Sequence, residues 1–205
     1  QEQEISILFA DIRGFTSFSE QKLPYDVVFL LNRYFRSMGE AIEGAGGRVD
    51  KFIGDGIMAL FGVDENAQQG ATSALKAAQG MSEKLDELNE LLKADLSEPL
   101  RIGIGIHAGP AIVGEMGYGP AISVTAIGDT VNTSSRLEAK TKDFGAQLIV
   151  SEHVAHLASI DATSLRREEI EVRGRKEPMQ IIVFDDAQVL SGLPRKAAEE
   201  PQPAS

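Results

Sequence analysis

Residues 48–61, with the sequence RVDKFIGDGIMALF, decide the fold that this chain is expected to adopt. Two short runs rich in apolar residues, Arg48–Ile53 and Ile57–Phe61, flank the triplet Gly54-Asp55-Gly56. Glycine and aspartate between two such runs are a strong signal for a tight turn joining antiparallel strands. The stretch therefore predicts a β-hairpin with a carboxylate at its tip.

A helix is expected on each side of this hairpin. Before it, Pro24 opens a stretch in which apolar residues recur at three- and four-residue spacing, and the glycines from Gly44 onward end it. After it, Asn66 to about Lys93 is a second amphipathic stretch. Further strands are expected at Ile5–Ala10, Leu100–Val113, Ile122–Ile127, Ala146–Val150, Leu165–Val172 and Met179–Phe184, and further helices at about Thr130–Lys142 and Glu152–Leu157.

The order strand, helix, two strands, helix, strand predicts an α+β domain with a ferredoxin-like, split βαβ core. Such a core places helices on one face of a mostly antiparallel sheet, and the later elements would be C-terminal α/β additions. Residues 1–190 are expected to form this single domain. From Ser191 to Ser205, Pro, Ala, Glu and Ser dominate and periodicity ends, which predicts a disordered tail or linker.

The amino-acid composition argues against a nucleic-acid-binding protein, a disulfide-bonded protein and a membrane-spanning segment in this chain. The 205 residues carry 31 acidic and 20 basic side chains and a net charge of −11, the opposite of the balance that nucleic-acid binding requires. The absence of cysteine excludes disulfides and thiolate chemistry, and no apolar run reaches the ~18 residues of a membrane span. We expect a cytoplasmic protein. The chain begins with Gln1, which leaves room for an upstream sensor or membrane-attached domain.

Two carboxylates are candidates for a metal site. Asp11 follows the apolar strand Ile5–Ala10, and Asp55 sits at the hairpin tip, so a ferredoxin-like sheet would bring them side by side. Carboxylate oxygens suit Mg²⁺ or Mn²⁺, and two such ions can clamp a phosphoryl displacement. Backbone N–H groups of Gly14-Phe15-Thr16, at a helix start, could hold phosphate. Taken singly, Asp55 is equally explained as a turn residue and Asp11 as a helix cap.

Four segments resemble class III adenylyl and guanylyl cyclases, in the order in which that family has them. They are Phe9–Thr16 (FADIRGFT), Lys51–Ala59 (KFIGDGIMA), Gly105–Gly109 (GIHAG) and Gly128–Leu137 (GDTVNTSSRL). The resemblance extends from about Ile5 to Phe184. It implies two divalent metal ions, Mg²⁺ or Mn²⁺, held by Asp11, Ile12 and Asp55.

The resemblance also implies how the nucleobase is read. Lys51 stands where adenine-selecting members carry a lysine that reaches adenine N1, and Thr125 stands where many carry an aspartate that accepts from the N6 amine. A hydroxyl can also accept that bond. In having a threonine at this position, the chain resembles a bacterial, soluble-type subgroup of adenylyl cyclases that includes bicarbonate-responsive members. Guanylyl cyclases have Glu and Cys at these positions. Taken alone, Lys51 could be a solvated strand residue and Thr125 an ordinary β-former.

Asn132 and Arg136 are one helical turn apart and would share a helix face. In the family this Asn orients the ribose, and this Arg stabilises charge that develops on the α-phosphate. Without the resemblance, they would be a helix-start residue and a surface cation.

Two positions depart from the family. The lysine that binds the triphosphate is replaced by Arg173, so Arg175 or Lys176 could do this work instead. An arginine that often precedes the Gly-Ile-His block is replaced by Gly103. Arg101, two residues earlier on the same face of a strand, is then a candidate phosphate contact.

The resemblance thus implies conversion of ATP to 3′,5′-cyclic AMP by in-line attack of the ribose 3′-hydroxyl on the α-phosphate. An Asp, a water or the substrate itself would take the proton. In a homodimer, one subunit would supply the metal pair and the other Lys51, Thr125, Asn132 and Arg136. The alternatives are a catalytically weak cyclase-like signalling module and a diguanylate cyclase, whose Gly-Gly-Asp/Glu-Glu-Phe signature is absent from the sequence.

Overall fold

The computed structural model describes residues 1–196. Its elements in chain order are β1 (Glu2–Ile12), α1 (Phe15–Glu20), α2 (Pro24–Gly44), β2 (Arg48–Ile53), β3 (Gly56–Phe61), α3 (Ala67–Leu91), β4 (Ile102–Met116), the 3₁₀ turn η1 (Gly119–Ala121), β5 (Ser123–Ile127), α4 (Asp129–Lys140), β6 (Leu148–Ser151), α5 (Glu152–Leu157), β7 (Arg167–Ile170), β8 (Met179–Phe184) and the 3₁₀ segment η2 (Ala187–Gly192). None of these helices is long and apolar enough to cross a membrane.

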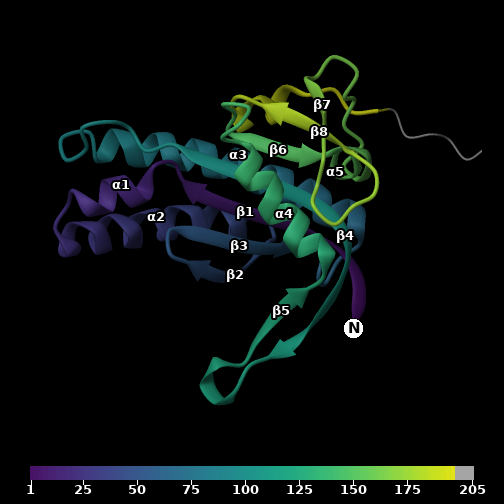
Figure 1. The fold of residues 1–205 in the computed structure, drawn as a ribbon, viewed down its shortest axis with the longest axis horizontal. Helices are drawn as coiled ribbons and strands as arrows, with labels where there is room; N and C mark the ends of the chain where they lie inside the picture. The colour runs from purple at the N-terminus through teal and green to yellow at the C-terminus, as the bar shows by residue number, and fades with distance from the viewer. Residues whose placement is uncertain (197–205) are drawn as a thin grey trace, which may run out of the picture.

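One sheet of eight strands organises this part of the chain (Figure 1). The strand order is β2-β3-β1-β4-β6-β8-β7, and β5 pairs with β4 outside that path. Only β4 and β6 pair in parallel among these strands. The order β2-β3-β1-β4, with α2 and α3 as the connections, confirms the predicted α+β, ferredoxin-like core with a mostly antiparallel sheet.

The two faces of the sheet are covered differently. Alternate residues of β6 point to opposite sides, so Leu148 and Val150 pack in the main core with α2 and α3, whereas Ile149 packs with Leu137 of α4. The core helices α2 and α3 share one face as expected, and α4, one of the later additions, lies on the other face, in front of the sheet in Figure 1. Gly105 of β4 allows this contact, because a Cβ there would lie 2.7 Å from the Glu138 Cα.

The long strand β4 serves two parts of the molecule. Residues 102–112 pair with β1, and 104–106 of these also pair with β6. Residues 112–116 pair with β5 in a hairpin that extends away from the body (Figure 1). The base of this hairpin packs on the face of β1 and β3 opposite α2 and α3, where Val113 and Ala126 join Ile7 and Met58 in a third apolar cluster. Several large apolar side chains on β4, β5 and the tip are exposed: Ile112, Tyr118, Ile122 and Ile127.

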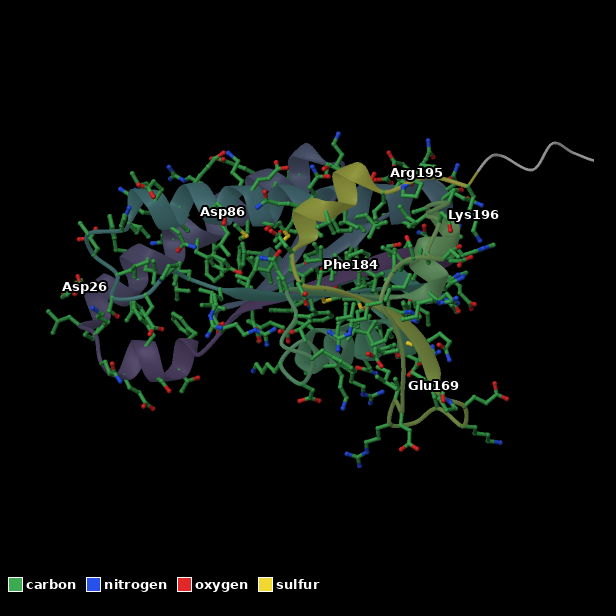
Figure 2. The ribbon with its side chains drawn as sticks, turned by 90° about the horizontal axis from the view of Figure 1, so that it is seen from above. Asp26, Asp86, Glu169, Phe184, Arg195 and Lys196 are labelled. Carbon is green, nitrogen blue, oxygen red and sulfur yellow. The ribbon has the colours of Figure 1, made fainter. Side chains whose placement is uncertain are left out.

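The packed chain continues past the predicted domain end at residue 190. Ser191 lies within η2, and Lys196 donates its N–H to the Ser159 carbonyl at 2.8 Å. The Arg195 guanidinium bonds the Ala158 carbonyl, so this segment lies against the end of α5 (Figure 2). Residues 191–196 therefore belong to the domain. The rest of the predicted tail, 197–205, lies outside the described residues.

Candidate active site

The end of β1 and the β2–β3 turn place two carboxylates at one corner of the sheet. β1 and β3 are antiparallel, with Ala10 opposite Ile57, so the turn that carries Asp55 lies beside Asp11 and Ile12. The Ile12 N–H donates to Oδ2 of Asp55 at 2.9 Å. This hydrogen bond fixes the turn to the strand end, which brings the two predicted metal ligands together.

The chemistry of this corner fits a divalent cation. Oδ1 of Asp11 is buried and has no hydrogen-bond partner among the described residues. Burial raises the pKa of Asp55, the Ile12 N–H lowers it, and the nearby Asp11 raises it again. A hard cation would supply the missing partner and offset the repulsion between the carboxylates. The described residues contain no group of three or more His, Cys, Asp or Glu that could hold a metal alone, so phosphate or water would complete the shell.

A third carboxylate lies next to Asp11. Glu138 on α4 is buried, and its Oε1 has no hydrogen-bond partner among the described residues. Burial first, and then the nearby Asp11, raise the pKa of Glu138 to about 8. Sequence reasoning missed Glu138, because a glutamate in a polar helix is typical of a solvated face. The available signal was that it continues the small-residue stripe of Thr130, Thr133 and Ser134, which are all buried.

The surroundings of Gly103 explain why this position does not carry the arginine that is common in the family. A Cβ at this position would lie 2.9 Å from Glu138 Oε1 and 3.2 Å from Arg13 Nη2. Arg13 therefore occupies the neighbourhood of the missing side chain, and its Nη2 donates to the Ala146 carbonyl at 2.7 Å. A larger residue at position 103 would displace both charged groups.

Lys51 and Thr125 meet on a carboxylate that the sequence analysis did not single out. The Thr125 hydroxyl donates to Oδ2 of Asp50 at 2.8 Å, and the Lys51 ammonium lies 3.3 Å from the same oxygen. The Asp50 side chain is fully buried, Thr125 is buried, and Lys51 is half exposed. One chain thus assembles the two predicted base-reading side chains from β2 and β5.

The outer face of α4 carries the second predicted pair. Asn132 is exposed and Arg136 is half-buried one turn later, while Leu137 and Glu138 point into the protein. The Arg136 guanidinium donates to the Arg173 carbonyl at 2.6 Å. This contact connects the predicted transition-state arginine to the β7–β8 connection, which carries the predicted triphosphate-binding residue.

Comparison with known proteins decides the family. Residues 1–185 match the family described as "Adenylate and Guanylate cyclase catalytic domain". The chain belongs to this cyclase family. It is 39% identical over 186 residues to an adenylate cyclase of Anabaena cylindrica and 35% identical over 149 residues to adenylate cyclase 1 of Rhizobium meliloti. These alignments cover 87% and 73% of the chain but only 36% and 22% of the relatives, so the cyclase domain spans about a third or less of their length.

Solved cyclase structures share the fold. The guanylyl cyclase Cya2 aligns with a TM-score of 0.80 at 32% identity, covering 89% of this chain and 92% of that one. The adenylyl cyclase CyaB from P. aeruginosa aligns with a TM-score of 0.78 at 27% identity, covering 98% of both chains. This chain is therefore similar both to a guanylyl cyclase and to an adenylyl cyclase. The similarity does not distinguish ATP from GTP, so the preference depends on the base-reading residues of this chain.

The phosphate-contact candidates of this cyclase domain lie in different places. Gly14, Phe15 and Thr16 lie two to four residues after Ile12, and Gly14 precedes the first turn of α1 with a left-handed backbone (φ 64°). Arg101 lines a cavity with Asp86, Asp185 and Asp186, and neither Asp11 nor Asp55 lines that cavity. The structure thus brings Gly14–Thr16 to the carboxylates but does not place Arg101 in a shared cavity with them.

Arg173 and Arg175 differ in what surrounds them. Both are exposed residues, but Arg175 Nη2 lies 3.4 Å from His107 Nε2 and 3.5 Å from Asp129 Oδ2. His107 also bonds Ser151 through Nδ1 at 2.9 Å. Burial, and to a smaller extent the nearby Arg175, lower the pKa of His107 to about 4. The His107 ring is therefore buried and neutral at pH 7.

The pKa of His107 predicts a measurable pH dependence of stability. Between pH ~6.5 and ~4 the unfolded ring binds a proton that the folded ring does not, so the free energy of unfolding falls as the pH falls. Protonation of His107 should lower the free energy of unfolding by about 3 kcal/mol between these two pH values. His107→Asn, which keeps a polar atom near Ser151, should lose that component. Urea unfolding of both proteins at pH 7, 5.5 and 4.5 tests this, and equal pH slopes would contradict it.

Proposed function

We propose that this domain converts ATP to 3′,5′-cyclic AMP and pyrophosphate. The observation that carries the proposal is the meeting of Lys51 and Thr125 on Asp50, which forms a base-reading group within one chain. The two relatives named as adenylate cyclases support it, and a cytoplasmic location remains the expectation.

The polar groups match adenine better than guanine. Lys51 offers a donor to adenine N1, and Thr125 offers an acceptor to the N6 amine. Guanine presents an N1–H donor where adenine has an acceptor, so the Lys51 ammonium would face another donor. An unmatched buried donor costs about 1–3 kcal/mol. The Glu and Cys expected of a guanylyl cyclase are absent from positions 51 and 125.

The reaction follows from the other two groups of residues. The ribose 3′-oxygen forms a bond to the α-phosphorus while the bond to pyrophosphate breaks. Asp11, Ile12 and Asp55 would hold two divalent ions, Mg²⁺ or Mn²⁺, which when bound supply Lewis-acid activation of the 3′-hydroxyl and charge neutralisation of the phosphates. The backbone of Gly14–Thr16 would bind phosphate oxygens near these carboxylates.

The residues of α4 and the β7–β8 connection would act on the same substrate. Asn132 would orient the ribose, and Arg136 would stabilise charge on the α-phosphate. Because Arg136 donates to the Arg173 carbonyl, substrate phosphate would have to replace or share that bond. Arg173 is the favoured triphosphate contact, since Arg175 is directed toward His107 and Asp129.

We further propose a homodimer with composite sites. The exposed apolar residues of the β4–β5 hairpin and of β2, where Phe52 and Ile53 are about half exposed, form a surface that a second copy could cover. A two-fold arrangement would place Asp11 and Asp55 of one subunit opposite Lys51, Thr125, Asn132 and Arg136 of the other.

The composite site predicts complementation between inactive variants. Asp55→Ala and Arg136→Ala should each abolish turnover while remaining folded. Mixing the two chains should restore up to about a quarter of wild-type activity, because half of the dimers are mixed and each has one intact site. Cyclic AMP formation is measured after verified subunit exchange. Absence of recovery would mean that each subunit builds its own site.

Base selection is tested by exchanging the reading pair. Lys51→Glu combined with Thr125→Cys should lower the ratio of kcat/KM for ATP to that for GTP by about tenfold or more, because both contacts to adenine are lost. The ratio is compared with that of the wild type under Mg²⁺ and under Mn²⁺. A wild-type enzyme that prefers GTP would overturn the base-reading proposal.

We also propose that bicarbonate regulates this domain, because bicarbonate-responsive cyclases resemble it in having a threonine at the position of Thr125. A small anion near Lys51 would alter active-site closure before chemistry. It would have to compete with Asp50, which is already 3.3 Å from the ammonium. Bicarbonate is expected to raise the steady-state rate at fixed pH and ionic strength, and an unchanged rate would remove this regulation from the proposal.

A further inference from the structure

Asp50 is a buried carboxylate with no part in the predicted machinery. Its side chain has no exposed surface, although β2 is at the edge of the sheet. Oδ2 receives the Thr125 hydroxyl at 2.8 Å and lies 3.3 Å from the Lys51 ammonium, and Oδ1 is buried without a hydrogen-bond partner among the described residues. Burial of a carboxylate costs free energy of folding, and a functional role for Asp50 would explain why that cost is tolerated.

The backbone of β2 explains how Asp50 and Lys51 both reach Thr125. Val49 pairs with Ala59 and Lys51 pairs with Met58, so Asp50 is an extra residue that has no partner on β3. In a regular strand, neighbouring side chains point to opposite faces. A β-bulge changes the direction of a side chain locally, and here it allows consecutive residues to share one partner.

Hydrogen-bond directions follow from the charges. The Thr125 hydroxyl donates to the carboxylate of Asp50, so the single hydroxyl proton of Thr125 is committed to Asp50. The Thr125 oxygen then has only lone pairs left for a ligand. Lys51 has three N–H donors, of which one suffices for Asp50.

We propose that Asp50 is the specificity-determining positioning residue of this domain, because it turns Thr125 into an obligatory acceptor. A threonine alone could accept from the N6 amine of adenine or donate to O6 of guanine. With its proton held by Asp50, it accepts from the amine and repels the carbonyl. This inference rests on the proposed recognition of adenine by Lys51 and Thr125. It adds Asp50 as the residue that determines whether Thr125 accepts or donates the hydrogen bond to the base.

The test compares ATP with purine riboside 5′-triphosphate, which lacks only the 6-amino group, and with inosine triphosphate, which carries O6. In the wild type, kcat/KM should be at least about tenfold higher for ATP than for the purine analogue, the value of one committed hydrogen bond. Asp50→Asn keeps the side-chain shape, and where its NH₂ group takes the place of Oδ2 it donates to Thr125 and frees the hydroxyl proton. Asp50→Ala offers Thr125 no acceptor at all, so it frees the proton without depending on the orientation of an amide. The ATP advantage should shrink about threefold or more, and relative activity with inosine triphosphate should rise.

Matched variants separate this inference from loss of structure and from the proposed function. Asp64→Asn removes the same charge from an exposed carboxylate that pairs with Arg48 of β2, and it should leave the ratios unchanged. Thr125→Val should abolish the ATP advantage, and adding Asp50→Asn to it should change the ratios no further. Ratios of kcat/KM do not depend on the fraction of folded enzyme, so partial misfolding does not affect the outcome.

The outcomes are distinct. If Thr125→Val leaves the ATP advantage intact, the proposed reading of adenine is wrong. If Thr125→Val abolishes it while both Asp50→Asn and Asp50→Ala leave all ratios at wild-type values, only the role of Asp50 is overturned. A further loss in the double variant relative to Thr125→Val would also overturn it, because Asp50 would then act independently of Thr125.

Discussion

The antiparallel pairing of β1 with β3 is the constraint on which the rest of the site depends. It places the β2–β3 turn beside the end of β1, and the hydrogen bond from Ile12 to Asp55 holds it there. Two carboxylates at one corner are unfavourable by themselves, and Asp11 adds to the burial that raises the pKa of Asp55. The strand pairing imposes this proximity, so a site that favours cations is a direct product of sheet topology.

Carboxylates recur as the organising groups of this domain. Asp11 and Asp55 form the candidate metal corner, Glu138 lies against Asp11 from α4, and Asp50 holds Lys51 and Thr125 together. The two regions are joined by the same short stretch of chain, because β2 carries Asp50 and Lys51 and leads into the turn with Asp55. Base reading and metal binding are therefore proposed functions of one hairpin.

The sequence predicted elements with strong local signals and missed features that depend on distant partners. The strand Arg48–Ile53 and the helix beginning at Pro24 were predicted correctly, because turn residues and apolar spacing define them locally. β1 begins at Glu2 instead of Ile5, since pairing with β4 continues through polar residues. Burial of Asp50 and Glu138 could not be predicted, because it depends on a bulge in β2 and on the absence of a side chain at Gly103.

The bulge at Asp50 also restricts how such a domain could evolve toward another base. Replacing Lys51 by an acidic residue would put a second negative charge next to a carboxylate that has no access to water, a repulsion much stronger than on a solvated surface. Loss of the charge of Asp50, or of the bulge itself, would relieve this repulsion. The stability cost of a changed base preference therefore depends on the order in which these substitutions occur.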